Sequence, residues 1–217
     1  MDVGELPYAK IHPLIKALAE EKRAKFRSCL DIGSGLRIQD SWFQRFAYTS
    51  EPRRFVAAEV DPEILAQLRE RGVETLNPLE QDTREMFDLS MALETIEHLR
   101  PEETVGFLNF CARMTEKLFV LTTPNFEYWR NMKATEDYKE CRWHPDHFRY
   151  FKPNSDDPHD HKQEMTPRIL ESYIRQSEFS SGWDVRIFRA WPWRLVDEAR
   201  EVNFRMHFKL FLSAYRT

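Results

Sequence analysis

The chain has 217 residues, of which 41% are hydrophobic and 31% charged, and this length and balance fit one sizeable globular domain. Its formal net charge of −4 argues against a general polyanion binder, although a local basic groove stays open. The three cysteines, Cys29, Cys111 and Cys141, have no CxxC spacing and are odd in number, so neither a disulfide framework nor a zinc knuckle is expected. No apolar run could span a bilayer and no signal peptide is recognisable, so we expect a cytoplasmic protein with no membrane partner.

Hydrophobic patterns predict strands that alternate with helices. In chain order, we expect a helix over 12–26, a strand from 28 into an acidic-glycine turn, a strand over 53–61, a helix over 62–73, strands over 73–79 and 87–93, a helix over 101–115 and a strand over 117–125. A helix over 166–179 and two paired strands over 183–188 and 207–215 follow. This alternation predicts a parallel sheet covered by helices on both faces.

No internal repeat or boundary divides the chain, so residues 1–217 are expected to form a single domain. Residues 126–163 are polar, aromatic and charged, and we expect them to form a lid-like insertion. Its place is over the carboxyl ends of the strands, where open α/β sheets bind ligands.

The stretch "LDIGSG" predicts a cofactor site at the end of the first sheet strand. Gly33 and Gly35 allow a tight turn that approaches a ligand, and Asp31 can accept hydrogen bonds. The second strand ends at Glu59, where a carboxylate can accept both hydroxyls of a ribose. A nicotinamide cofactor is the alternative, but the third glycine of GxGxxG would fall at Ile38, which is β-branched and argues against it.

From Cys29 to Asn125 the chain resembles the class I S-adenosylmethionine-dependent methyltransferases. "LDIGSG" is similar to their first motif, "AAEVDPEIL" to their ribose-binding second motif, "FDLSMALETIEHL" to the segment at their fourth strand and "LTTPN" to the end of their fifth. The resemblance implies a Rossmann-like, seven-stranded, mostly parallel sheet with an antiparallel C-terminal hairpin. It also implies S-adenosylmethionine bound by Asp31, Gly33, Gly35, Glu59 and Asp61. Arg37 stands where many members have a third glycine, and its side chain either crowds the loop or points outward.

The stretch "ALETIEHL" places Glu94, Glu97 and His98 at offsets of three and four, which bring side chains together on a helix. A simpler alternative is that Glu94 ends a strand while Glu97 is a solvated acid at a helix N-terminus. Downstream, "HDHKQEMT" offers His159 and His161. Two carboxylates and two imidazoles suit a divalent ion with open positions, and imidazoles favour manganese, cobalt or iron over magnesium.

The pattern E-x-x-E-H with a later "DHKxExT" resembles the small-RNA 3′-terminal 2′-O-methyltransferases. The resemblance implies that Glu94, Glu97, His98 and His161 are catalytic residues that bind one divalent metal, manganese or magnesium. "HPDHFRYF" contains a competing "DH", so His147 is an alternative fourth ligand. The chain departs from that family in having no separate RNA-binding domain and no clear proline-rich motif ahead of the cofactor site.

Three functions remain open at this point. In the first, a cation holds the vicinal hydroxyls of an RNA 3′-terminal ribose and makes one of them more nucleophilic. In the second, the acceptor is a small catechol-like molecule, since "EHL" and "TPN" also resemble the O-methyltransferases of ubiquinone biosynthesis. In the third, the chain binds the cofactor without catalysis, a reading that Arg37 favours.

The insertion is rich in basic and aromatic residues between Tyr128 and Lys152. Such a mixture suits a single nucleic-acid strand, with phosphates paired and bases stacked. Acidic residues are interleaved, so a charged and aromatic lid over the site accounts for the same pattern equally well.

Overall fold

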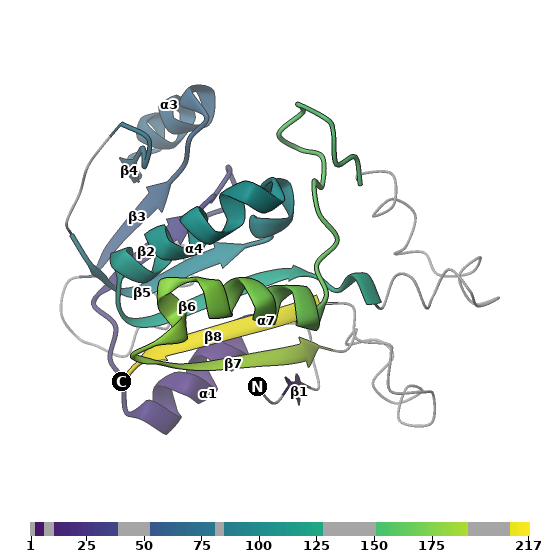
Figure 1. Ribbon diagram of the computed structural model, residues 1–217. Coiled ribbons are helices and arrows are strands. Elements are labelled where there is room, and N and C mark those ends of the chain that lie inside the picture. Colours follow the sequence, from purple (N-terminus) through teal and green to yellow (C-terminus); the bar gives the residue numbers. More distant parts are fainter. Residues whose placement is uncertain (1–2, 7–10, 39–52, 81–84, 128–150, 191–208) are drawn as a thin grey trace, which may run out of the picture.

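The computed structural model describes residues 3–6, 11–38, 53–80, 85–127, 151–190 and 209–217 (Figure 1). One sheet organises these residues, with the strand order β1-β7-β8-β6-β5-β2-β3-β4. The strands are β1 (Val3–Leu6), β2 (Ser28–Ile32), β3 (Arg54–Ala58), β4 (Glu74–Leu76), β5 (Phe87–Leu93), β6 (Thr115–Pro124), β7 (Trp183–Ala190) and β8 (Lys209–Arg216). The helices are α1 (Ile11–Lys22), α3 (Pro62–Glu70), α4 (Pro101–Met114) and α7 (Pro167–Gln176), with single 3₁₀ turns at Ile96–His98 and Glu178–Ser180.

The mostly parallel sheet expected from the sequence is confirmed. Strands β2 to β6 pair in parallel, and β8 lies antiparallel between β6 and β7. The antiparallel C-terminal pair is therefore present. A short strand, β1, adds to the expected seven by pairing in parallel with the outer edge of β7.

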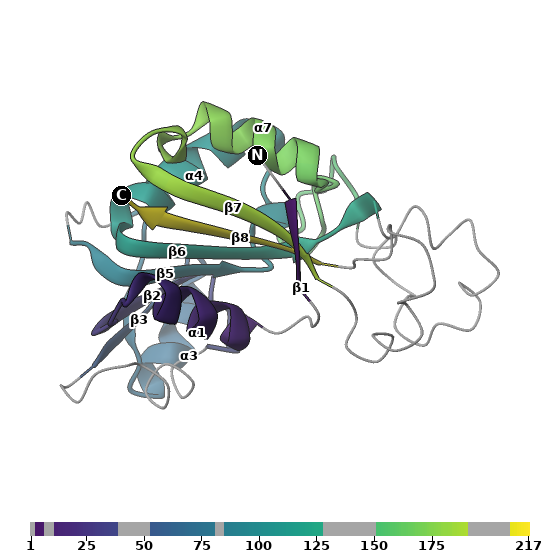
Figure 2. The same cartoon turned by 90° about the horizontal axis from the view of Figure 1, so that it is seen from below.

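Helices cover both faces of the sheet (Figure 2). On one face, α4 and α7 pack through residues such as Leu108 and Leu170. On the other, α1 and α3 pack through residues such as Ile15 and Leu68. Strand β5 lies between these layers and six of its seven residues are buried, which explains its nearly continuous apolar sequence.

Several elements end earlier than the sequence pattern predicts. Helix α1 stops at Lys22, because Arg23 takes a left-handed conformation with φ 50°. Strand β4 stops at Leu76, after which the side chain of Asn77 accepts a hydrogen bond from Leu79 N and turns the chain. Helix α7 stops at Gln176, where the next residue caps a 3₁₀ turn.

The parallel strands all end at one edge of the sheet, and β8 begins there at Lys209. This edge collects the residues between Ile32 and Ile38, those after Ala58, and those after Leu93. In the described part of the chain, no helix is long and apolar enough to cross a bilayer.

Candidate active site

The glycine turn after β2 has the shape that the sequence predicts. Gly33 and Gly35 both lie in the left-handed region, with φ 67° and 54°. Gly33 N donates to Ala58 O at 2.8 Å, and Gly35 N donates to Glu59 Oε2 at 3.0 Å. The turn is therefore tied to the end of the neighbouring strand β3. Arg37 is exposed and so points outward rather than crowding the loop.

Gly33 also lies against the segment that carries the predicted metal ligands. A Cβ atom at Gly33 would stand 2.4 Å from Thr95 Cγ2 and 2.7 Å from Thr95 Oγ1. Thr95 in turn donates to Ile32 O at the end of β2. Only glycine fits this close approach, and the two predicted sites therefore touch each other.

The acidic residues assigned to the cofactor site take different roles. Glu59 is 9% exposed, and its Oε1 accepts hydrogen bonds from Val60 N and Asp61 N while Oε2 accepts from Gly35 N. Oε1 already has two donors, whereas Oε2 has one, so Oε2 keeps a lone pair with which Glu59 can accept a ligand hydroxyl. Asp61 caps α3 by accepting from Glu63 N. Asp31 is buried at the end of β2.

Three exposed apolar side chains lie near the same strand ends and were missed in the sequence. Leu36 follows β2, Val60 follows β3 and Leu79 follows β4, with exposures of 41%, 50% and 80%. These strands are neighbours in the sheet, in the order β2-β3-β4. Val60 directly follows Glu59 in the chain. Single exposed apolar residues are common, so only their shared location in the fold makes this group visible.

The segment "ALETIEHL" is not the continuous helix that its spacing suggests. Glu94 directly follows β5 and has a left-handed conformation with φ 56°, and a single 3₁₀ turn then carries Glu97 and His98. Such a conformation is costly for a non-glycine residue and is held by its surroundings. Here Glu94 N donates to Thr122 O at 3.0 Å, while Glu94 Oε1 accepts from Thr122 Oγ1 at 2.7 Å and pairs with Lys209 Nζ at 3.1 Å.

Glu97 is buried rather than solvated, with 2% of its surface exposed. Its Oε2 accepts a hydrogen bond from Thr123 Oγ1 at 3.0 Å, whereas Oε1 has no hydrogen-bond partner among the described residues. Burial and the nearby charge of Glu94 raise the pKa of Glu97 well above its usual value. An unsatisfied buried carboxylate oxygen is unfavourable unless a ligand completes it.

Two imidazoles lie beside this carboxylate. One ligand atom from each of Glu97, His98 and His161 lies within 4.8 Å of the other two, and the rings of His98 and His161 meet edge to face at 4.9 Å. His98 Nδ1 lies 3.3 Å from Asp160 O, a contact in which Nδ1 donates and Nε2 keeps its lone pair. Burial lowers the pKa of His98 and outweighs that hydrogen bond, so the ring is held in the neutral form that binds metals.

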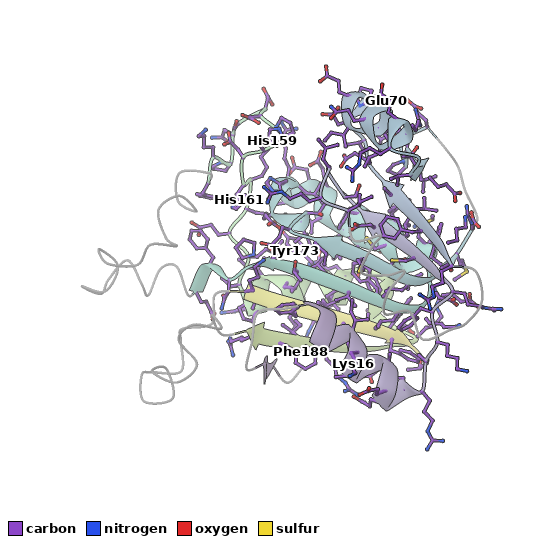
Figure 3. All side chains as sticks on the ribbon, turned by 180° about the vertical axis from the view of Figure 1, so that it is seen from behind. Lys16, Glu70, His159, His161, Tyr173 and Phe188 are labelled. Carbon is purple, nitrogen blue, oxygen red and sulfur yellow. The ribbon has the colours of Figure 1, made fainter. Side chains whose placement is uncertain are left out.

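The structure thus brings together three of the four predicted metal ligands. Glu94 lies close enough to influence the charge of Glu97, with its own carboxylate held by Thr122 and Lys209. His161 occupies the segment 151–163 that faces the sheet edge, and His159 on the same segment is exposed (Figure 3). His147 and most of the basic and aromatic stretch lie outside the described residues.

The residues present fit a divalent cation. One carboxylate and two imidazoles suit manganese, cobalt or iron better than magnesium, which prefers oxygen ligands throughout. Glu97 Oε1, which no hydrogen bond from the described residues satisfies, is an oxygen that a cation could bind. The glycine turn, Glu59 and the three apolar side chains fit a nucleoside next to it.

Solved methyltransferases share this fold. The chain is similar to the plantazolicin methyltransferase BamL, with a TM-score of 0.62 and 9% identity over 95% of this chain and 83% of that one. It is similar to the small RNA methyltransferase HEN1, with a TM-score of 0.61 and 16% identity, and it spans 27% of that longer chain. A SAM-dependent methyltransferase from Archaeoglobus fulgidus matches with a TM-score of 0.56 and 16% identity over 94% of both chains.

No known family profile matches the sequence. No curated protein matches it either. The protein therefore has the fold of the class I S-adenosylmethionine-dependent methyltransferases, and that assignment comes from the arrangement of its strands and helices.

Proposed function

We propose that this protein is a methyltransferase that uses S-adenosylmethionine and a divalent metal to methylate an oxygen of a vicinal diol, such as the 3′-terminal ribose of RNA. The observation that carries the proposal is the buried Glu97 carboxylate, which lies beside His98 and His161 and has one oxygen with no hydrogen-bond partner in the described part of the chain. This cluster touches the glycine turn through Thr95. A methyl donor and an oxygen acceptor would therefore meet at one edge of the sheet.

The residues around the glycine turn would hold the donor. Gly33 and Gly35 bring the backbone close to it, and Glu59 accepts a hydroxyl of its ribose through Oε2 while holding the turn in place. Val60 and Leu79 offer apolar surface for its base. Bound S-adenosylmethionine supplies the methyl group on an activated sulfonium.

The residues around Glu97 would hold the metal and orient the acceptor. Thr123 and Thr122 fix the carboxylates of Glu97 and Glu94 through hydroxyl donors. Asp160 O orients the ring of His98, so that Nε2 is the free atom. A divalent cation here would bind two adjacent hydroxyls and lower the pKa of the one that is methylated.

An RNA acceptor is supported by the vicinal diol of its 3′-terminal ribose and by structural similarity to two solved structures. The HEN1 and Pnkp1/Rnl/Hen1 structures are named for small RNA methylation and RNA repair, and the chain matches them with TM-scores of 0.61 and 0.56. A catechol presents the same pair of oxygens and is the second candidate. BamL, named as a plantazolicin methyltransferase, has the same fold, so the fold alone does not identify the acceptor.

The test is methyl transfer from radiolabelled S-adenosylmethionine with manganese or with a chelator. The acceptors are RNA with a 3′-terminal diol, the same RNA with a 2′-deoxy or 3′-phosphate end, and a catechol. We expect label on the diol RNA alone, only with manganese. Label on the catechol alone would assign the second candidate, and label that survives the chelator would exclude a catalytic metal. No label with any acceptor, while S-adenosylmethionine binds, would indicate a binding protein without activity.

A matched pair of variants tests the metal ligands directly. His161→Ala removes an imidazole of the cluster, whereas His159→Ala removes an exposed one two residues earlier. We expect His161→Ala to lose manganese binding and methylation while it keeps S-adenosylhomocysteine binding. His159→Ala should keep all three. If the two variants behave alike, His161 is not a metal ligand.

A further inference from the structure

The side chain of Gln163 connects the turn of the candidate metal site to its surroundings. Gln163 is 8% exposed. Its Nε2 lies 3.0 Å from Ile96 O, 3.0 Å from Leu99 O and 2.7 Å from Thr104 Oγ1, and its two N–H groups are shared among these three acceptors. Ile96 and Leu99 flank Glu97 and His98, so one amide binds the backbone on both sides of the two ligands.

The orientation of this amide follows from its partners. Two of them are carbonyl oxygens, and Thr104 Oγ1 already donates to Arg100 O at 3.1 Å. All three therefore accept, and the Gln163 atom that faces them is the NH₂ group. On the other side, Gln163 Oε1 accepts from Tyr173 OH on α7 at 2.9 Å. The amide thus links the turn to α4 and α7.

Backbone hydrogen bonds from the segment 151–163 also hold the turn that bears Glu97 and His98. Lys162 N donates to Glu97 O at 2.8 Å, and Gln163 N approaches the same oxygen at 3.4 Å. His161 precedes these residues directly. The ligands from the turn and the ligand from the segment 151–163 are more than sixty positions apart in the chain, and these hydrogen bonds join them.

We infer that Gln163 is a positioning residue, which fixes the turn bearing Glu97 and His98 against the segment bearing His161. This inference rests on the proposed metal site. Metal affinity depends on ligands that are already held in place, and outer-shell partners typically contribute about 10- to 100-fold to it. Loss of the amide would leave two buried carbonyls with fewer donors and would release the turn from α4 and α7.

The test compares two glutamines of the same region. Gln163→Met keeps the length of the side chain and removes its donors. Gln176→Met is the control, since Gln176 lies exposed on α7 and, among the described residues, its side chain bonds to Ser172 of the same helix. Manganese affinity is measured by electron paramagnetic resonance of the free ion, and S-adenosylhomocysteine affinity by calorimetry.

We expect Gln163→Met to weaken manganese binding at least tenfold, with S-adenosylhomocysteine affinity within about twofold of the wild type. Gln176→Met should change neither affinity. Unchanged manganese affinity in Gln163→Met would overturn the inference, as would equal losses of both ligands. If Gln163→Met does not fold, Tyr173→Phe takes its place, because it removes only the hydroxyl that holds Oε1. A folded Tyr173→Phe with wild-type manganese affinity would then overturn the inference.

The same experiment separates this inference from the function on which it rests. Failure of the wild-type protein to bind manganese contradicts the proposed metal site. Manganese binding that is equal in the wild type and in Gln163→Met leaves the metal site intact and rejects only the role of Gln163.

Discussion

The buried carboxylate of Glu97 destabilises the folded protein but is suited to bind a cation. Its carboxylate is buried beside Glu94, and one oxygen has no hydrogen-bond partner among the described residues. Both features disfavour the charged form, whereas a carboxylate must be deprotonated to bind a metal. Such a conflict is common at functional sites, where stability is given up for a prepared binding group.

Glu97→Gln is therefore expected to stabilise the metal-free protein at neutral pH and to abolish manganese binding. The folded-state pKa is raised, so the stability linked to this group is complete below its unfolded pKa, about 4.5, and is lost as the pH rises toward the folded value. Each unit of such a shift corresponds to about 1.4 kcal/mol. In thermal unfolding with a chelator present, Glu97→Gln should have a higher melting temperature than the wild type. This difference should grow as the pH is raised from 4 to 8. Glu102→Gln, which changes an exposed acid on α4, is the control; a gain of the same size there would contradict the expectation.

Gly33→Ala tests the close approach of the glycine turn to Thr95. Gly72 has a similar φ, 75° against 67°, but a Cβ there would meet nothing within 4 Å. Gly72→Ala should cost only the backbone strain, roughly 1–2 kcal/mol. Gly33→Ala should lower the free energy of unfolding in urea by more than Gly72→Ala does. It should also weaken S-adenosylhomocysteine binding at least tenfold, because the turn must move away from Thr95. Equal effects of the two substitutions would show that the contact with Thr95 is unimportant.

At the scale of elements, Asp88 holds three strands together at the edge opposite the candidate site. Its Oδ2 accepts from Arg27 N at 2.6 Å and Ser28 N at 3.3 Å, at the start of β2, and its Oδ1 pairs with Lys117 of β6 at 2.6 Å. Burial alone would raise the pKa of Asp88, but these donors outweigh it and lower the pKa. The carboxylate therefore stabilises the central strands in its charged form.

Asp88→Asn should lower the free energy of unfolding at pH 7 by about 1–3 kcal/mol, the usual cost of a lost charged hydrogen-bond partner in a buried place. Because the folded pKa is lowered, this stabilisation is present above the unfolded pKa of about 3.8 and is lost as the pH falls through the folded value. The difference between wild type and Asp88→Asn in urea unfolding should therefore shrink in acid. Asp156→Asn, at a side chain that is 94% exposed, should have little effect at any pH. A difference for Asp88→Asn that stays constant down to pH 2 would contradict the assigned role.

At the scale of the whole molecule, both candidate sites occupy the edge where the parallel strands end. A ligand at 100 times its dissociation constant stabilises a folded protein by about 2.7 kcal/mol. At this chain length each kcal/mol raises the melting temperature by about 2–4 °C. S-adenosylhomocysteine should thus raise it by roughly 5–10 °C, and manganese should add a second increase that a chelator removes. A chelator that also removes the first increase, or no increase with S-adenosylhomocysteine, would contradict the two-site arrangement.

Much of the fold could be predicted from the sequence because strand and helix periodicity are local properties of the chain. The stretch "FDLSMAL" predicted β5 with the bounds that the structure has. Thr166 followed directly by Pro167 predicted the start of α7. The glycine turn and Glu59 were also recognisable, because a left-handed backbone and an acidic strand end leave direct marks on residue type. Strand β1 was not recognised, since its four residues gain their structure by pairing with β7.

The geometry of the candidate metal site was decided by tertiary structure. Helical spacing suggested that Glu94, Glu97 and His98 converge, yet Glu94 lies in a left-handed conformation held by Thr122 of the neighbouring strand. The burial of Glu97 depends on the elements packed around it and cannot be read from its neighbours in the chain. The meeting of His98 with His161 depends on hydrogen bonds that return a distant segment to the sheet edge. Sequence thus determined which residue types were available, and long-range pairing decided which of them meet, because side-chain proximity across a sheet is fixed by packing rather than by spacing along the chain.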